Sequence, residues 1–147
     1  MPPTSVEVSY ELEPDDFPHE TDLTLISPHL RLYTALDTNE IVELFYVTAT
    51  DDGQGLAPTG QRVFGHFNIP FFNDDRRLVM VFDVNASAVS IAFAGGTFSQ
   101  TETGRLQVFG AGGQALAEYV TSPRGAGEIE VMTITRDSAD IAFAIAY

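Results

Sequence analysis

The sequence predicts an all-β protein, a single antiparallel β-sandwich domain over residues 1–147 with about ten short strands and little helix. Three observations predict this class. Apolar and polar residues alternate in stretches, short β-branched and aromatic runs recur along the chain, and clusters of Gly, Pro, Asn, Asp and Ser separate most of these runs. Short strands at such spacing are typical of sandwiches and barrels. A chain of 147 residues is also long enough for one domain with its own core.

The first expected strand spans residues 6–12, where Val, Tyr and Leu alternate with Glu and Ser, so that the apolar side chains share one sheet face. Residues 41–45 could form one helical turn, because Ile41, Leu44 and Phe45 would share a face, but the β-branched residues that follow favour a strand. The remaining runs predict strands at residues 23–26, 30–36, 41–50, 62–67, 78–84, 88–94, 105–109, 115–120, 128–135 and 141–147.

The stretch APTGQRVFGH, residues 57–66, reads as an active-site loop or as a turn that leads into a strand. Its Pro and Gly residues are typical of a turn, and residues 62–67 of the strand that follows. His66 then lies between aromatic residues, where a packed histidine is more common than a catalytic base, and no nucleophile motif accompanies it. The glycine cluster at residues 110–113 predicts a hairpin turn and not a phosphate loop, because no helix follows and the chain has no lysine.

The chain is strongly acidic, with 21 Asp and Glu residues against seven arginines and a formal net charge of −14. This charge repels phosphate backbones, so we expect no nucleic-acid partner. The chain contains no cysteine and no closely spaced histidine pair, so we expect no transition metal. No apolar run approaches the roughly 18 residues of a membrane helix, and we expect no membrane-spanning segment.

Five segments carry a family pattern: DDFPHETDLTL (residues 15–25), APTGQRVFGH, LVMVFDVNASAVSIAFAGG (residues 78–96), GRLQVFGAGGQALAEYV (residues 104–120) and ITRDSADIAFAIAY (residues 134–147). Together they resemble the jelly-roll, galactose-binding-like β-sandwich domains of bacterial exported proteins, especially those with a PEP-CTERM-type sorting signal. The resemblance implies a jelly roll, a location outside the cell or at its surface, and glycan binding. Such domains usually continue into one more strand after a segment like DIAFAIAY, so we expect either a missing strand with an uncovered edge or a sheet that ends differently.

Four carboxylates, Asp15, Asp16, Glu20 and Asp22, crowd one loop. Carboxylate oxygens suit Ca²⁺, and the resemblance would place Asp140 near this loop, close to a structural calcium. The calcium set would then be Asp15, Asp16, Glu20, Asp22 and Asp140. The alternative is an acidic solvated surface, which a chain of net charge −14 has in any case.

Sugar-binding surfaces combine exposed aromatic rings with carboxylates and amides. Adjacent strand residues point to opposite faces, so Phe71 and Phe72 cannot both belong to the core. The candidate ligand-binding residues are Asp51, Asp52, Phe71, Phe72 and Arg76. We therefore expect a non-catalytic extracytoplasmic binding or adhesion module, glycan-binding and calcium-stabilised. The alternative is a structural or assembly subunit that self-associates through a sheet edge or face, as in a filament, coat or surface layer. A hydrolase with two carboxylates lacks an identifiable pair, and we expect no enzyme activity.

Overall fold

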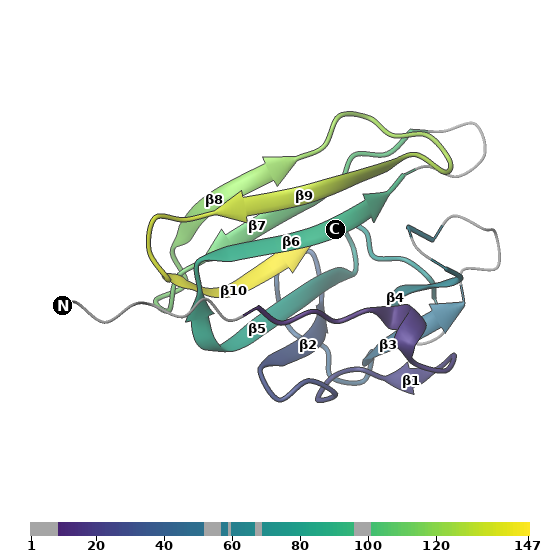
Figure 1. Cartoon of the computed structure of the whole chain (residues 1–147), viewed down its shortest axis with the longest axis horizontal. Coiled ribbons are helices and arrows are strands. Elements are labelled where there is room, and N and C mark those ends of the chain that lie inside the picture. Colours follow the sequence, from purple (N-terminus) through teal and green to yellow (C-terminus); the bar gives the residue numbers. More distant parts are fainter. Residues whose placement is uncertain (1–8, 52–56, 59, 67–68, 96–100) are drawn as a thin grey trace.

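The computed structural model describes residues 9–51, 57–58, 60–66, 69–95 and 101–147. These residues form ten strands and one short 3₁₀ helix but no α-helix, which confirms the predicted all-β class (Figure 1). The elements are η1 (Pro14–Asp16), β1 (Thr21–Asp22), β2 (Leu30–Ala35), β3 (Val47–Asp51), β4 (Arg62–His66), β5 (Arg77–Ala86), β6 (Ala88–Ala94), β7 (Arg105–Phe109), β8 (Ala115–Val120), β9 (Ile129–Thr135) and β10 (Ile141–Ala146).

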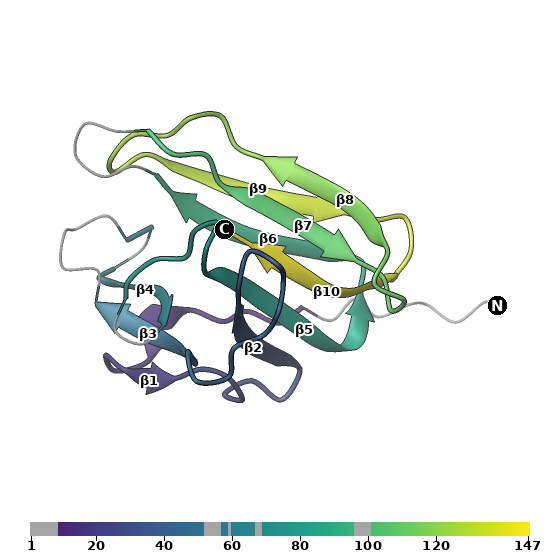
Figure 2. The ribbon, with the colours of Figure 1, turned by 180° about the vertical axis from the view of Figure 1, so that it is seen from behind.

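The strands form facing layers (Figures 1 and 2). One layer is a five-stranded antiparallel sheet in the order β2-β5-β10-β7-β8, and the opposite side contains the pair β6-β9 and the three-stranded sheet β1-β3-β4. Strand β5 continues into β6, and β9 into β10. Because β5 pairs with β10 and β6 with β9, these four strands form one antiparallel ribbon that passes from one layer to the other. A ribbon folded over two sheets is the basis of a jelly roll, so the predicted sandwich is confirmed.

The core lies between the layers and is built from the alternating apolar side chains of the strands. Leu32, Leu106 and Val108 from the five-stranded sheet are 0–1% exposed and belong to one cluster with Val47 of β3 and Met132 of β9. In a half-buried strand every second side chain points inward, and this period explains why β7 shows alternating buried and half-buried residues. Removing this surface from water is the main free-energy gain of folding.

Strand β10 lies in the middle of its sheet and not at an edge. Ala144 pairs with Met80 of β5 on one side and with Val108 of β7 on the other. The run IAFAIA suits a position buried on both sides, since it carries no charge and four of its six residues are buried. The expected uncovered edge at the last strand is therefore not found, and the sheet ends at β2 and β8 instead.

Three expected strands are wrong in whole or in part. Residues 9–12 form no strand, and residues 6–8 lie outside the described residues. Residues 23–26 turn, because the Asp22 carboxylate accepts a hydrogen bond from the Thr24 N–H at 2.9 Å. Residues 42–46 form a loop, and β3 begins at Val47. Apolar residues of these segments pack as loops, as Leu23 does at 0% exposure, so a β-like composition is not sufficient for a ladder.

Candidate functional site

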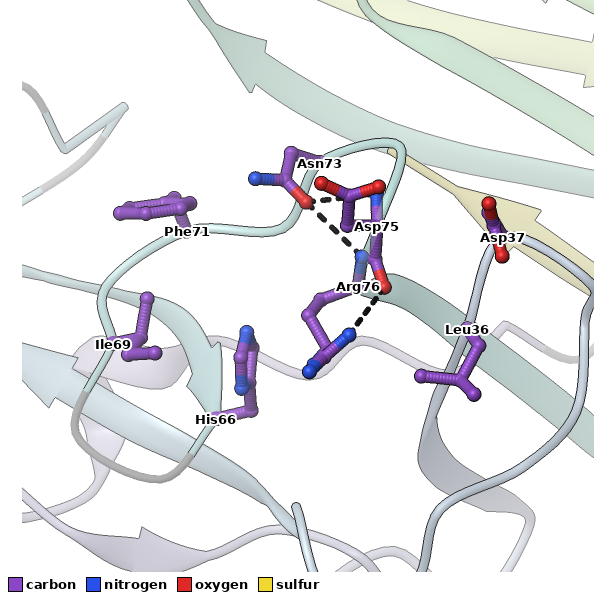
Figure 3. A pocket seen from close by; sticks show the side chains of 8 residues that line it. All are labelled: Leu36, Asp37, His66, Ile69, Phe71, Asn73, Asp75 and Arg76. Atoms are coloured by element: carbon purple, nitrogen blue, oxygen red, sulfur yellow. Dashed lines mark hydrogen bonds between the residues drawn. The ribbon is translucent and has the colours of Figure 1, made fainter.

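An open pocket of about 580 Å³ lies where β4 ends and the chain returns toward β5 (Figure 3). Two local devices shape this connection. The His66 N–H donates a hydrogen bond to the Ile69 carbonyl at 3.0 Å, and the Ile69 N–H donates to the His66 carbonyl at 2.8 Å. The Asn73 side chain accepts from the N–H groups of Asp75 and Arg76, both at 3.0 Å, which is the turn-forming role expected of Asn. The lining residues are Leu36, Asp37, His66, Ile69, Phe71, Asn73, Asp75 and Arg76.

His66 is the innermost polar group of this pocket. The residue is 2% exposed, and neither ring nitrogen makes a well-formed hydrogen bond within the described part of the chain, although the ring interacts with the Phe71 backbone. The ring lies 5.0 Å from Phe72 and 6.2 Å from Phe45, centroid to centroid. Burial, and then the Arg76 charge, lower the pKa of His66, while the Phe71 backbone opposes this. At neutral pH the ring is therefore uncharged and presents one donor and one acceptor.

Arg76 supplies the positive charge of the pocket. Its guanidinium lies 4.9 Å over the Phe45 ring and donates one hydrogen bond, at 2.8 Å, to the Asp75 carbonyl. No ion pair holds it in the described residues, whereas the neighbouring Arg77 is paired with Asp74. A guanidinium has five N–H donors, so most of those of Arg76 are available to a ligand.

The two phenylalanines separate as predicted, although neither lies in a strand. Phe71 is 54% exposed and lines the pocket, whereas Phe72 packs against the main core cluster. The structure thus brings the predicted residues Phe71 and Arg76 into one pocket, with Phe72 behind it. Asp51 lies elsewhere, at the end of β3, where it pairs with Arg62 at 3.2 Å. Asp52 lies outside the described residues.

Sequence reasoning missed the inward-facing role of His66 and three polar contributors, Asn73 and Asp75 in the turn before β5 and Asp37. Asp37 lies just after β2, and Arg76 lies just before β5. Because β2 pairs with β5, Asp37 comes close to Arg76 and lines the pocket. No local pattern signals that approach. For His66, the position at a strand end before an Ile-Pro-Phe-Phe run was visible, but the absence of a hydrogen-bond partner is a property of the packing.

The predicted calcium ligands are partly engaged in other contacts. Asp15 accepts from the Gln61 and Arg62 N–H groups at 2.9 and 2.8 Å, and it lies against Gly60, whose φ of +53° suits glycine. Asp140 pairs with Arg136 at 2.9 and 3.1 Å, and this hydrogen bonding lowers the pKa of Asp140. Asp22 caps the turn at Thr24, and Asp16 and Glu20 are exposed.

Within the ranges that the structure describes, no three His, Cys, Asp or Glu residues gather closely enough to hold a metal ion. Asp140 lies before β10, beside the β5 end at Ala86, and Asp15 lies in η1 beside β3 and β4. The calcium site stays a prediction.

The described residues include no helix that is long and apolar enough to cross a membrane. Comparisons of the chain with models of protein families, with curated proteins and with solved structures found no match in any of the three. The resemblance to galactose-binding-like domains therefore stays a prediction.

Proposed function

We propose that the protein is a non-catalytic binding module that holds a neutral saccharide in the pocket of His66, Phe71 and Arg76. The observation that carries this proposal is the buried His66 ring at the base of an open pocket, a ring whose nitrogens make no well-formed hydrogen bond with the described residues. A buried polar group without a partner costs about 1–3 kcal/mol, and a ligand hydroxyl that reaches it would remove that cost.

The rest of the pocket suits a sugar ring. The exposed face of Phe71 can cover the C–H side of the ring, while Arg76 and the Asn73 amide N–H groups donate to hydroxyl oxygens and Asp37 and Asp75 accept from hydroxyl groups. The neutral imidazole has the same donor-and-acceptor character as a hydroxyl group. Two carboxylates in the lining, together with the net charge of −14, disfavour an anionic ligand. The pocket volume of about 580 Å³ fits a small ligand.

A titration of the protein with methyl glycosides of glucose, galactose, mannose and fucose, followed by ¹H–¹⁵N NMR, tests this proposal. We expect at least one glycoside to shift the signals of Phe71 and Arg76. Phe71→Ala should weaken binding by about tenfold, which corresponds to about 1.4 kcal/mol for a lost stacking contact.

The matched control is Val84→Ala, which truncates a 74% exposed apolar residue on β5 that does not line the pocket. This variant should bind like the unmodified protein. If none of the glycosides moves any signal of the pocket residues, the saccharide proposal is wrong.

Self-association is a second candidate function, and the outer face of β6-β9 favours it. The outward positions carry no charge in a chain of net charge −14, and Ile129 and Val131 are 44% and 55% exposed there. Two copies could meet on this face without bringing carboxylates together. The outward residues are Ala88, Ser90, Ala92, Ala94, Ile129, Val131, Thr133 and Thr135.

A further inference from the structure

A second open pocket, of about 610 Å³, lies along the edge of the five-stranded sheet at β2. It shares no lining residue with the His66 pocket. Two loops frame it, because the Leu32 N–H donates to the Thr24 carbonyl at 3.1 Å and the Val42 N–H donates to the Thr34 carbonyl at 2.8 Å. These bonds attach both loops to β2. The lining residues are Asp22, Thr24, Leu25, Ile26, Leu32, Tyr33, Thr34, Val42, Glu43 and Tyr46.

Two threonine hydroxyls in this pocket have no hydrogen-bond partner. Thr34 is 1% exposed, and its Oγ1 is buried without a partner in the described structure. The Oγ1 atom of Thr24, in the loop that is hydrogen-bonded to β2, is also buried without a partner. Both oxygens are buried beneath the pocket surface, and a hydroxyl oxygen accepts hydrogen bonds, so a ligand that displaces the overlying atoms gains two unused acceptors.

The charge of the pocket has one sign. Asp22 and Glu43 line it, and no Arg or His does so in the described ranges. One oxygen of Asp22 already accepts from the Thr24 N–H, at 2.9 Å, whereas Glu43 lies in the loop that precedes β3 and is exposed. Two carboxylates without a basic neighbour attract a cation, and the net charge of −14 adds to this attraction.

The remaining walls are apolar and aromatic. Leu25 is 69% exposed and Ile26 is 42% exposed, and both border the opening. Tyr33 and Tyr46 also line the pocket. Tyr46 is 42% exposed, and the face of an exposed aromatic ring attracts cations. This surface suits an apolar stem that ends in a positive charge.

We infer that this second pocket binds a small alkylamine in its primary ammonium form. The ammonium group has three donors and no acceptor, which matches a lining that offers Thr24 Oγ1, Thr34 Oγ1 and carboxylate oxygens. The alkyl stem packs against Leu25 and Ile26. This site is independent of the proposed saccharide function, because neither its residues nor its ligand chemistry are shared.

The test is an NMR titration of the full chain with n-butylammonium chloride, with n-butanol and sodium chloride as matched probes. Butylammonium should shift the backbone signals of residues 22–26, 33–34 and 43–46 with saturation, and neither other probe should reproduce this. Thr34→Val removes the unpartnered hydroxyl at nearly constant shape and should weaken butylammonium binding at least about tenfold, as expected for the loss of one hydrogen bond to a charged group. Glu43→Gln should also weaken it.

Two control variants make the result specific. Thr133→Val changes an exposed threonine on β9, and Glu40→Gln changes an exposed carboxylate that does not line the pocket. Both should bind butylammonium like the unmodified protein. If butanol causes the same shifts as butylammonium, only the apolar walls bind the ligand. If Thr34→Val and Glu43→Gln bind butylammonium as well as the unmodified protein does, the binding reflects a general attraction to an acidic surface. Either result, or no saturable shift, overturns the inference.

Discussion

At the residue scale, His66 combines burial with titration. Its two ring nitrogens make no well-formed hydrogen bond in the described structure. Burial and the Arg76 charge lower its pKa more than the Phe71 backbone raises it. Proton binding therefore favours the unfolded chain, in which an imidazole titrates near about 6.5. The contribution of His66 to the free energy of unfolding is therefore complete above that pH. It is lost as the pH falls toward the lower pKa of the folded state.

The pH dependence of stability should therefore change when His66 is replaced. We expect the free energy of unfolding of the unmodified protein to fall between pH 6.5 and 5, by at most about 1.4 kcal/mol per pH unit from this group. His66→Gln keeps polar atoms at this position but cannot titrate, so its curve should be flatter in that interval. Urea unfolding at several pH values measures the difference. Parallel curves for the two proteins would contradict the role given to His66.

Glu130 illustrates the opposite direction of pKa change. The Tyr119 hydroxyl donates to it at 2.7 Å, the Arg124 Nε donates at 2.9 Å, and these bonds lower the pKa of Glu130. Stability from such a carboxylate is lost only as the pH falls below its ordinary value, near about 4.3. The two groups therefore act in separate pH intervals, and the comparison with His66→Gln isolates the effect of His66.

At the element scale, β4 determines the floor of the His66 pocket. Gly65 pairs with Thr48 of β3 and lies directly before His66. A Cβ atom at Gly65 would collide with the Ile69 carbonyl and the Thr50 side chain. Glycine in the interior of a strand often marks such a close approach. The close approach here holds the segment that carries Ile69 against β4.

Gly65→Ala should therefore destabilise the protein by about 1–3 kcal/mol, the usual cost of overpacking a buried position. The control is Gly112→Ala in the β7-β8 turn, where the added Cβ would meet only the end of the flexible Gln114 side chain. Urea unfolding of both variants gives the comparison. A loss for Gly65→Ala no larger than for Gly112→Ala would show that β4 and the Ile69 segment are not tightly packed.

At the scale of the whole molecule, the distribution of charge limits where two copies can meet. Most faces carry part of the net charge of −14, whereas the outward side of β6-β9 carries none in its strand positions. Repulsion between exposed charges is screened by salt over about 8–10 Å at 0.1–0.15 M. Self-association through the uncharged face should accordingly be promoted by moderate salt.

The second candidate function thus predicts a concentration-dependent dimer or larger species in light scattering. Val131→Glu, which places a charge in the centre of the uncharged face, should abolish it. Val84→Glu adds the same charge at another exposed valine, on β5, and should leave association unchanged. A monomer at all concentrations and salt levels would eliminate this candidate.

The sequence by itself determined the class of the fold and several of its elements. The predicted bounds of β6, β7 and β8 agree with the structure, and the glycines at residues 110–113 form the predicted turn, with Gly113 at a φ of +81°. These features are local: side chains alternate with a period of two along a strand, and a tight turn needs residues that tolerate positive φ. No partner strand has to be known to recognise them.

Only the tertiary structure decided which strands pair and which loops meet. The central position of β10, the loop at residues 42–46 and the pairing of Asp140 with Arg136 all depend on contacts between residues whose approach no local pattern predicts. The His66 pocket combines the end of β4, the turn before β5 and the turn after β2, so Phe71 and Arg76 could be named from the sequence but their position beside His66 could not. The periodicity of apolar residues along the sequence predicts which side chains are buried. The packing of distant segments determines which residues those side chains contact.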